Sequence, residues 1–152
     1  MLILLLVLEA IQVAILWLHD WVPLPPLNDV RAVQGQDSTA RLVVVTVVQS
    51  LPFTIGFALT LLWLNEHRPA WVWDWLWISN VVLLLGQLRA WWLPYLMRPE
   101  PQRAARYRAM FARTHAFLPE RNGITPNTLH CALHGATIGI LIVLALLPSG
   151  LR

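Results

Sequence analysis

Five histidines are the side chains of this 152-residue chain that are best suited to acid–base or metal chemistry, because the histidine pKa lies near neutrality. His130 and His134 are four residues apart. On a helix this spacing places both rings on one face, about 6 Å apart, where they can share one metal ion. Two hypotheses follow. Either the pair holds a divalent metal with a third ligand from His115, His19 or Asp20, or both rings only form hydrogen bonds to neighbouring helices.

Arginine supplies the second type of chemistry. All 11 basic residues are Arg, so lysine nucleophiles and Schiff bases are excluded. Guanidinium groups bind carboxylates and phosphates, and the N-terminus of a helix also attracts anions. Asn127 stands where an apolar helix is expected to begin, either as its cap or as part of an anion site. The sequence therefore predicts an anion-binding group formed by Asn127, Arg121 and Arg98, with Arg89 beside it.

Other catalytic chemistry finds no support in the sequence. Cys131 is the only cysteine, which excludes a disulfide within the chain and a cysteine-based zinc site. The sequence contains no G-x-S-x-G, G-x-G-x-x-G, H-E-x-x-H or P-loop pattern. The net charge of +3 belongs to arginines that flank apolar segments, where anionic lipid is the nearer partner. We therefore predict membrane lipids, and no nucleic acid, as partners.

The composition indicates a membrane protein. Apolar residues make up 57% of the chain and charged residues 12%, whereas an ordinary soluble domain has about 25% charged residues. Four segments, at about 1–18, 42–64, 72–96 and 128–147, are apolar, and about 20 helical residues cross a bilayer. Because lipid satisfies no backbone polar group, these segments must be helices. The predicted fold is a single all-α domain over 1–152, an integral membrane four-helix bundle.

The connectors differ in character. The segment 19–41 is rich in proline and is expected to lack helix. The segment 97–127 holds six arginines, and between them apolar residues recur at helical spacing. This pattern predicts an amphipathic helix, lying on the membrane surface between the third and fourth transmembrane helices and closed by His115. Its apolar side would consist of Tyr107, Met110, Phe111, Thr114 and Leu118.

Arginine also predicts the orientation of the chain. The segments 19–41 and 97–127 hold eight arginines, against two in the remaining connector and the C-terminus. Since positive loops stay in the cytoplasm, both segments are expected there and both termini outside, as in a bacterial-type inner membrane. The nine tryptophans fall near the ends of the spans, where head-group anchoring is expected.

Polar residues inside the spans predict where a site lies. Helical rise places five of them about 4–8 Å from the midpoints of their spans, toward the cytoplasm, and they are expected to face one another. They are Gln12, Gln49, Gln87, Arg89 and His134. Glu9 is expected near the midplane, protonated or paired with Asn80 or an Arg.

Three functions fit this pattern. The first is an enzyme or binder of a lipid or isoprenoid-like anionic ligand, with His115, His130 or His134 as base and Arg89 holding the anion. The second is an accessory subunit of a larger membrane complex, in which the polar layer only holds helices together. The third is a small proton or solute transporter that acts as a homo-oligomer, with Glu9 and His134 titrating.

Overall fold

The computed structural model describes residues 1–64, 69–97 and 101–147, and within these ranges it is helical and contains no strand. The all-α prediction is therefore confirmed. The elements are α1 (Leu2–Leu18), α2 (Val30–Gln34), α3 (Thr39–Leu62), α4 (Ala70–Gln87), the π-helix η1 (Leu88–Trp92), α5 (Leu93–Leu96), α6 (Pro101–Phe111) and α7 (Thr128–Leu146).

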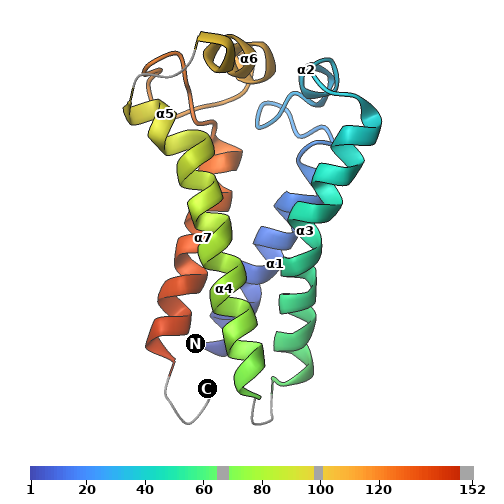
Figure 1. Cartoon of the computed structure of the whole chain (residues 1–152), viewed down its shortest axis with the longest axis vertical. Helices are drawn as coiled ribbons and strands as arrows, with labels where there is room; N and C mark the ends of the chain where they lie inside the picture. The colour runs from blue at the N-terminus through green and yellow to red at the C-terminus, as the bar shows by residue number, and fades with distance from the viewer. Residues whose placement is uncertain (65–68, 98–100, 148–152) are drawn as a thin grey trace.

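The long helices pack side by side (Figure 1). Helix α1 contacts α3 and α7, and α4 contacts α7 and α3. In the described part of the chain, three helices are long and apolar enough to cross a membrane: α3, the continuous stretch Ala70–Leu96, and α7. Helix α1 is apolar but has 17 residues. Helices α2, α5 and α6 lie together at one end of the molecule, opposite the start of α1.

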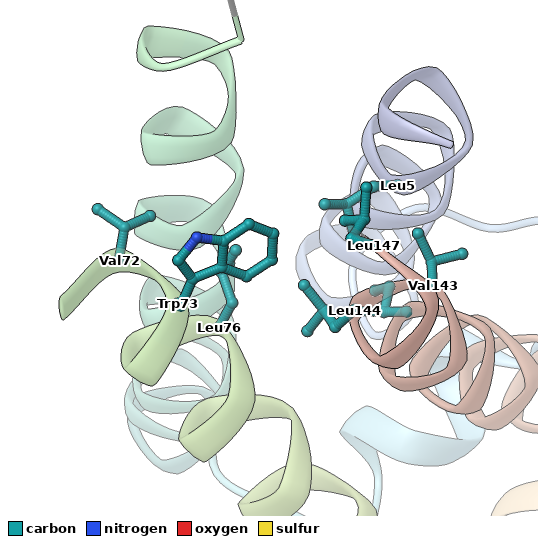
Figure 2. Packing of buried hydrophobic residues seen from close by; sticks show 8 residues of the cluster. Leu5, Val72, Trp73, Leu76, Val143, Leu144 and Leu147 are labelled. Carbon is teal, nitrogen blue, oxygen red and sulfur yellow. The ribbon is translucent and has the colours of Figure 1, made fainter. Parts of the chain in front are cut away.

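A hydrophobic core joins α1, α4 and α7 at the end away from α2 and α6. Figure 2 shows Trp73 and Leu76 of α4 facing Leu5 of α1 and Leu144 of α7. Leu5 and Leu144 are fully buried, and Leu76 nearly so. Burying each such side chain contributes about 1.5–3 kcal/mol relative to water.

Hydrogen bonds between buried polar side chains link the same three helices further along. The Thr137 hydroxyl accepts a hydrogen bond from the Nε2 of Gln12 and another from that of Gln87, each at 3.0 Å. Gln12 Nε2 also donates to Asn80 Oδ1, at 3.0 Å. Of the five residues predicted to share a polar layer, Gln12 and Gln87 both donate to Thr137, whereas Gln49 is exposed.

Glu9 has a different partner from those expected. The Thr60 hydroxyl of α3 donates to Glu9 Oε1 at 3.0 Å, and both residues are buried. Asn80, the expected partner, is occupied by Gln12. Spacing along a helix gives the depth of a side chain, whereas the rotation of each helix decides which groups meet.

The segment 19–41 contains more helix than the sequence indicated, and the segment 97–127 contains less. The proline-rich segment contains the short helix α2, capped by Asp29, whose side chain accepts a hydrogen bond from Ala32 N. Helix α6 ends at Phe111, so Thr114, His115 and Leu118 lie beyond it.

The apolar side of α6 is covered by protein. Met110 packs with Val33 of α2 and Leu42 of α3, and Phe111 packs against Trp91. The prediction of a helix lying with its apolar side on lipid is therefore replaced by a helix docked on α2 and η1. The helical spacing of apolar residues predicts that a helix has an apolar side, but it does not indicate whether lipid or protein covers that side.

Pro94 explains how α6 is docked. Proline has no backbone N–H, so it offers no hydrogen bond to Ala90 O one turn earlier. The Tyr107 hydroxyl of α6 donates to Ala90 O at 2.8 Å. The helix also widens into the π-helix η1 just before this proline. A break in the spanning helix therefore creates the acceptor that positions α6 and its arginines.

Candidate functional site

A cavity of about 720 Å³ lies at the end of the molecule that carries α2 and α6. It is lined by the end of α1, by α3, by α4 with η1, by α6 and by α7, and we call it the basic cavity. Five of the residues predicted to take part in catalysis or in metal or anion binding line it: His19, Asp20, Arg89, His130 and His134.

The other predicted site residues lie elsewhere. His115 is exposed, and its Nδ1 is 2.7 Å from the Thr128 hydroxyl. Arg121 is exposed and places its Cζ 5.6 Å from the centre of the Tyr95 ring. Neither residue lines the basic cavity. Arg98 lies outside the described residues. Of the residues predicted to bind an anion that the structure describes, Asn127 and Arg121 are thus outside the basic cavity, and Arg89 lines it.

Asn127 caps α7 and orients His130. Its Oδ1 accepts a hydrogen bond from His130 N at 3.0 Å, which fills the expected role of helix cap. The same oxygen accepts from His130 Nδ1 at 2.6 Å. Because the backbone N–H identifies this atom as the amide oxygen, His130 carries its proton on Nδ1. The neutral ring then presents the lone pair of Nε2, for which the described residues supply no hydrogen-bond donor.

His134 has the opposite tautomer. Trp92 Nε1 donates to His134 Nδ1 at 3.1 Å, and an indole N–H can only donate. The neutral His134 ring therefore carries its proton on Nε2. The two rings are 6.4 Å apart between centroids. Helix α7 thus supplies the basic cavity with one acceptor nitrogen and one donor nitrogen, a turn apart.

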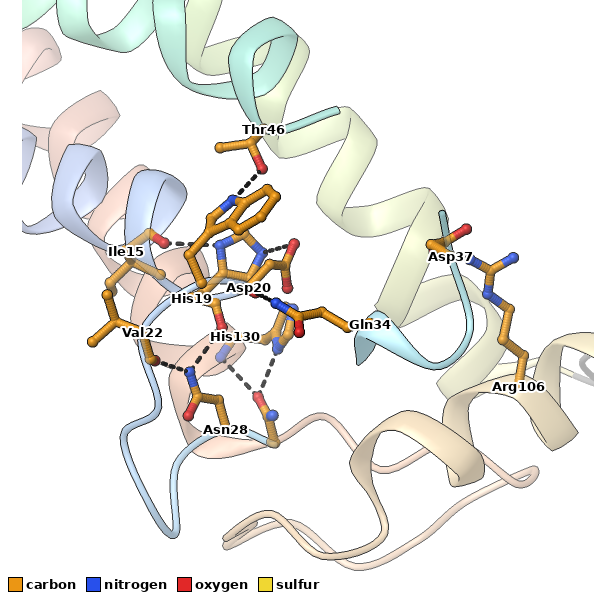
Figure 3. A network of polar contacts seen from close by, with 12 residues as sticks. Ile15, His19, Asp20, Val22, Asn28, Gln34, Asp37, Thr46, Arg106 and His130 are labelled. Atoms are coloured by element: carbon orange, nitrogen blue, oxygen red, sulfur yellow. Dashed lines mark hydrogen bonds and ion pairs between the residues drawn. The ribbon is translucent and has the colours of Figure 1, made fainter. Parts of the chain in front are cut away.

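His19 and Asp20 form a pair where α1 ends (Figure 3). His19 Nδ1 donates to Ile15 O at 2.8 Å, and His19 Nε2 lies 3.2 Å from Asp20 Oδ2. With Nδ1–H already committed, a single further proton is shared between Nε2 and the carboxylate. Burial raises the pKa of the Asp20 carboxyl above its ordinary value, an effect that His19 opposes and Asp37 reinforces.

An aromatic cluster surrounds His130. Its ring centroid lies 4.2 Å from that of Trp91 and 5.2 Å from that of Phe111. The His19 ring stands perpendicular to it at 5.8 Å. Figure 3 shows His19, Asp20 and His130 next to one another, although they come from opposite ends of the chain. The aromatic rings fix the orientation of His130 and leave its edge toward the cavity.

The arginines of the basic cavity divide into two groups. Asp37 forms ion pairs with Arg41, at 2.8 Å, and with Arg106. Among the described residues, Arg89 and Arg103 have no acidic partner. The lining contains four arginines and two aspartates, which gives a formal charge of +2 with neutral histidines. The sequence analysis predicted Arg89 as an anion-binding residue, but nothing in the segment 97–127 distinguished Arg103 from the other arginines there.

Apolar side chains form the rest of the wall. Leu16, Leu83 and Leu133 line the cavity from α1, α4 and α7. On the side between α3 and α4, the lining residues Gln49 and Gly86 are exposed. A Cβ added at Gly86 would meet no heavy atom within 4 Å. The cavity therefore opens sideways between two helices that are long and apolar enough to cross a membrane.

The predicted metal site with three protein ligands is not formed by the described residues. No group of three or more His, Cys, Asp or Glu side chains among them is arranged to hold a metal ion. His130 and His134 instead direct one nitrogen each to Asn127 and Trp92.

Comparison with known proteins gave no match: no family model, no curated protein and no solved structure resembles this chain significantly.

Proposed function

We propose that this protein is a four-helix integral membrane protein that binds an amphiphilic anion, a lipid or isoprenoid-like phosphate, in the basic cavity. One observation carries the proposal. Two guanidinium groups without acidic partners among the described residues, Arg89 and Arg103, share a cavity with leucines from three helices. A guanidinium group can donate two parallel hydrogen bonds to the oxygens of one phosphate. The leucines form an apolar wall against which the hydrocarbon chain of the ligand can pack.

The exposed surface supports insertion in a membrane. Side chains such as Val48, Val82 and Ile142 are more than half exposed on the three long helices. In water this surface would be a large apolar patch, whereas lipid tails would cover it at no cost. Helix α1, at about 1.5 Å per residue, also spans most of the hydrocarbon layer.

The charge distribution gives the proposed orientation. Helix α6 and the loops around it carry most of the arginines. The positive-inside rule places this end, and therefore the mouth of the basic cavity, at the cytoplasmic leaflet of a bacterial-type inner membrane. An anionic head group in that leaflet lies at the level of Arg89 and Arg103.

The sideways opening supports entry from the bilayer. Gln49 and Gly86 line the cavity from within apolar helices and are flanked by the exposed Val48 and Leu85. A chain lying between lipids can slide past Gly86 without crossing water. The ligand is therefore expected to partition into the membrane first.

The alternative functions have less support. An accessory subunit has no need of unpaired arginines in a cavity. A transporter needs polar groups that are open to its solute, but Gln12, Gln87 and Thr137 bind one another. These hydrogen bonds support helix packing rather than transport.

Binding of dodecyl phosphate to the full chain in lipid nanodiscs tests the proposal. The double variant Arg89→Gln/Arg103→Gln should weaken binding by at least roughly 100-fold, since two charge-assisted hydrogen bonds of about 1.5–3 kcal/mol each amount to about 3–6 kcal/mol. The matched control Arg31→Gln/Arg121→Gln removes the same charge outside the basic cavity and should bind nearly as the wild type does. Dodecanol, which lacks the anion, should bind weakly to all three proteins. Equal losses in both double variants would show that only net charge attracts the ligand, and would refute the site.

A further inference from the structure

We propose that the basic cavity is catalytic: it hydrolyses the phosphate ester bond of the bound amphiphile, with His130 as general base and the His19–Asp20 pair as general acid. This inference rests on the proposed binding function. It goes further because binding alone needs no proton donor or acceptor pair, whereas His19, Asp20, His130 and His134 all line the cavity.

His130 has the structure of an oriented base. Its Nδ1–H is held by Asn127 Oδ1 at 2.6 Å, which keeps the lone pair on Nε2. Asn127 is itself held, because its Nδ2 donates to Thr114 Oγ1 at 3.2 Å and to Leu27 O at 3.4 Å. Packing against Trp91 fixes the plane of the ring. A base whose tautomer and orientation are both fixed loses little entropy when it takes a proton.

The acid lies within reach of the same ligand. His19 Nδ1–H is committed to Ile15 O, so the proton shared with Asp20 is the one available for transfer. The His19 and His130 rings are 5.8 Å apart between centroids, close enough for one phosphoryl group to contact both. His134, with its proton on Nε2, supplies a further donor to a phosphate oxygen.

The reaction is a direct attack by water, in which the His130 imidazole acts as a base toward water and not as a nucleophile toward phosphorus; the cavity lining contains no Ser, Thr, Cys or Lys. His130 Nε2 takes one proton of the water while the water oxygen forms a bond to phosphorus. The bond between phosphorus and the ester oxygen breaks, and its electron pair stays on that oxygen, which receives the proton of the His19–Asp20 pair. Arg89 and Arg103 stabilise the charge on the phosphoryl oxygens. The proton then passes from His130 to the His19–Asp20 pair, leaving an alcohol and inorganic phosphate.

The test uses dodecyl phosphate in nanodiscs, with binding and phosphate release measured on the same samples. Reaction in ¹⁸O-water should place one ¹⁸O atom in the released phosphate. His130→Gln should reduce the turnover rate by about 10²- to 10⁴-fold while changing Kd by less than about threefold. His115→Gln, a histidine substitution outside the cavity, should leave both unchanged.

Asn127 is a positioning residue in this scheme, and it has its own readout. In ¹⁵N-histidine spectra, wild-type His130 should show a protonated Nδ1. Asn127→Ala should produce a mixture of tautomers and lower turnover, whereas Asn127→Asp retains the acceptor oxygen and should retain the tautomer. If Asn127→Ala folds poorly in detergent, Asn127→Asp is measured in its place. A loss of turnover in Asn127→Asp with an unchanged His130 tautomer would contradict a role of Asn127 in orienting His130.

The outcomes separate the two proposals. Phosphate release that is lost in His130→Gln, with binding kept, supports catalysis. If dodecyl phosphate binds through Arg89 and Arg103 but the wild type releases phosphate no faster than His130→Gln does, catalysis is overturned and the binding function remains. Absence of arginine-dependent binding overturns the proposed function itself.

Discussion

Replacing Thr137 by Val should destabilise the protein more than any similar loss of one hydroxyl on its surface. The side chain is fully buried, and valine keeps its shape. The substitution removes the acceptor of Gln12 Nε2 and Gln87 Nε2, both at 3.0 Å, together with a bond within α7 to Leu133 O. Hydrogen bonds between membrane helices are worth about 0.6 kcal/mol on average and about 1–2 kcal/mol at most. Two such bonds give an expected loss of roughly 1–3 kcal/mol.

The free energy of unfolding, from titration with sodium dodecyl sulfate in mixed micelles, measures this loss. Ser79→Ala is the matched control, because the Ser79 hydroxyl donates only to carbonyls of its own helix. Adding Gln87→Met to Thr137→Val should restore part of the stability, since a missing bond costs most when one buried partner is left behind. A Thr137→Val protein within about 0.5 kcal/mol of the wild type, the range of neutral surface changes, would refute the claim that these bonds hold α1, α4 and α7 together.

Two further substitutions test the mouth and the acid of the basic cavity. Gly86→Leu adds a side chain at the sideways opening, where an added Cβ meets no heavy atom within 4 Å. It should therefore keep stability and weaken dodecyl phosphate binding by roughly tenfold, or about 1.4 kcal/mol. Gly135→Leu, at a position that is also open to a Cβ but outside the cavity, should bind normally, and a similar loss in both variants would exclude entry at Gly86. Because burial raises the pKa of the Asp20 carboxyl, its protonated form stabilises the fold below about pH 4 and this contribution is lost as the pH rises through the raised value. Above about pH 4, the unfolding midpoint of Asp20→Asn should therefore fall less steeply with rising pH than that of the wild type. An equal slope in both proteins would count against a buried Asp20 carboxyl.

The secondary structure followed closely from local pattern. The expected spans 42–64, 72–96 and 128–147 correspond to helices 39–62, 70–96 and 128–146. Long apolar runs permit little besides helix, and Asn127 marks the start of α7 through its side-chain acceptor. The shorter elements were missed or misjudged. Helix α2 follows a run of prolines, and α6 stops at Phe111 although apolar residues continue at helical spacing.

The site was predictable in its residue types but not in its composition. His19, Asp20, Arg89, His130 and His134 stood out as candidate bases, metal ligands or anion-binding groups, and all five line the basic cavity. Arg103 did not stand out as a site residue, and Tyr107 was expected only on the apolar side of an amphipathic helix, because α6 reaches the cavity through the carbonyl left free by Pro94. Arg121 and His115 looked equally suitable on spacing, but the loop that carries them turns away.

The sequence alone determined that the chain is helical, apolar and basic at one end, because hydrophobicity, helical period and charge are local properties that each residue carries with it. Only the tertiary structure decided which polar groups meet. Rotation of each helix about its axis joins Gln12 to Thr137 rather than Gln49, and pairs Glu9 with Thr60 rather than Asn80. That rotation is set by packing among all the helices at once, which no single segment encodes.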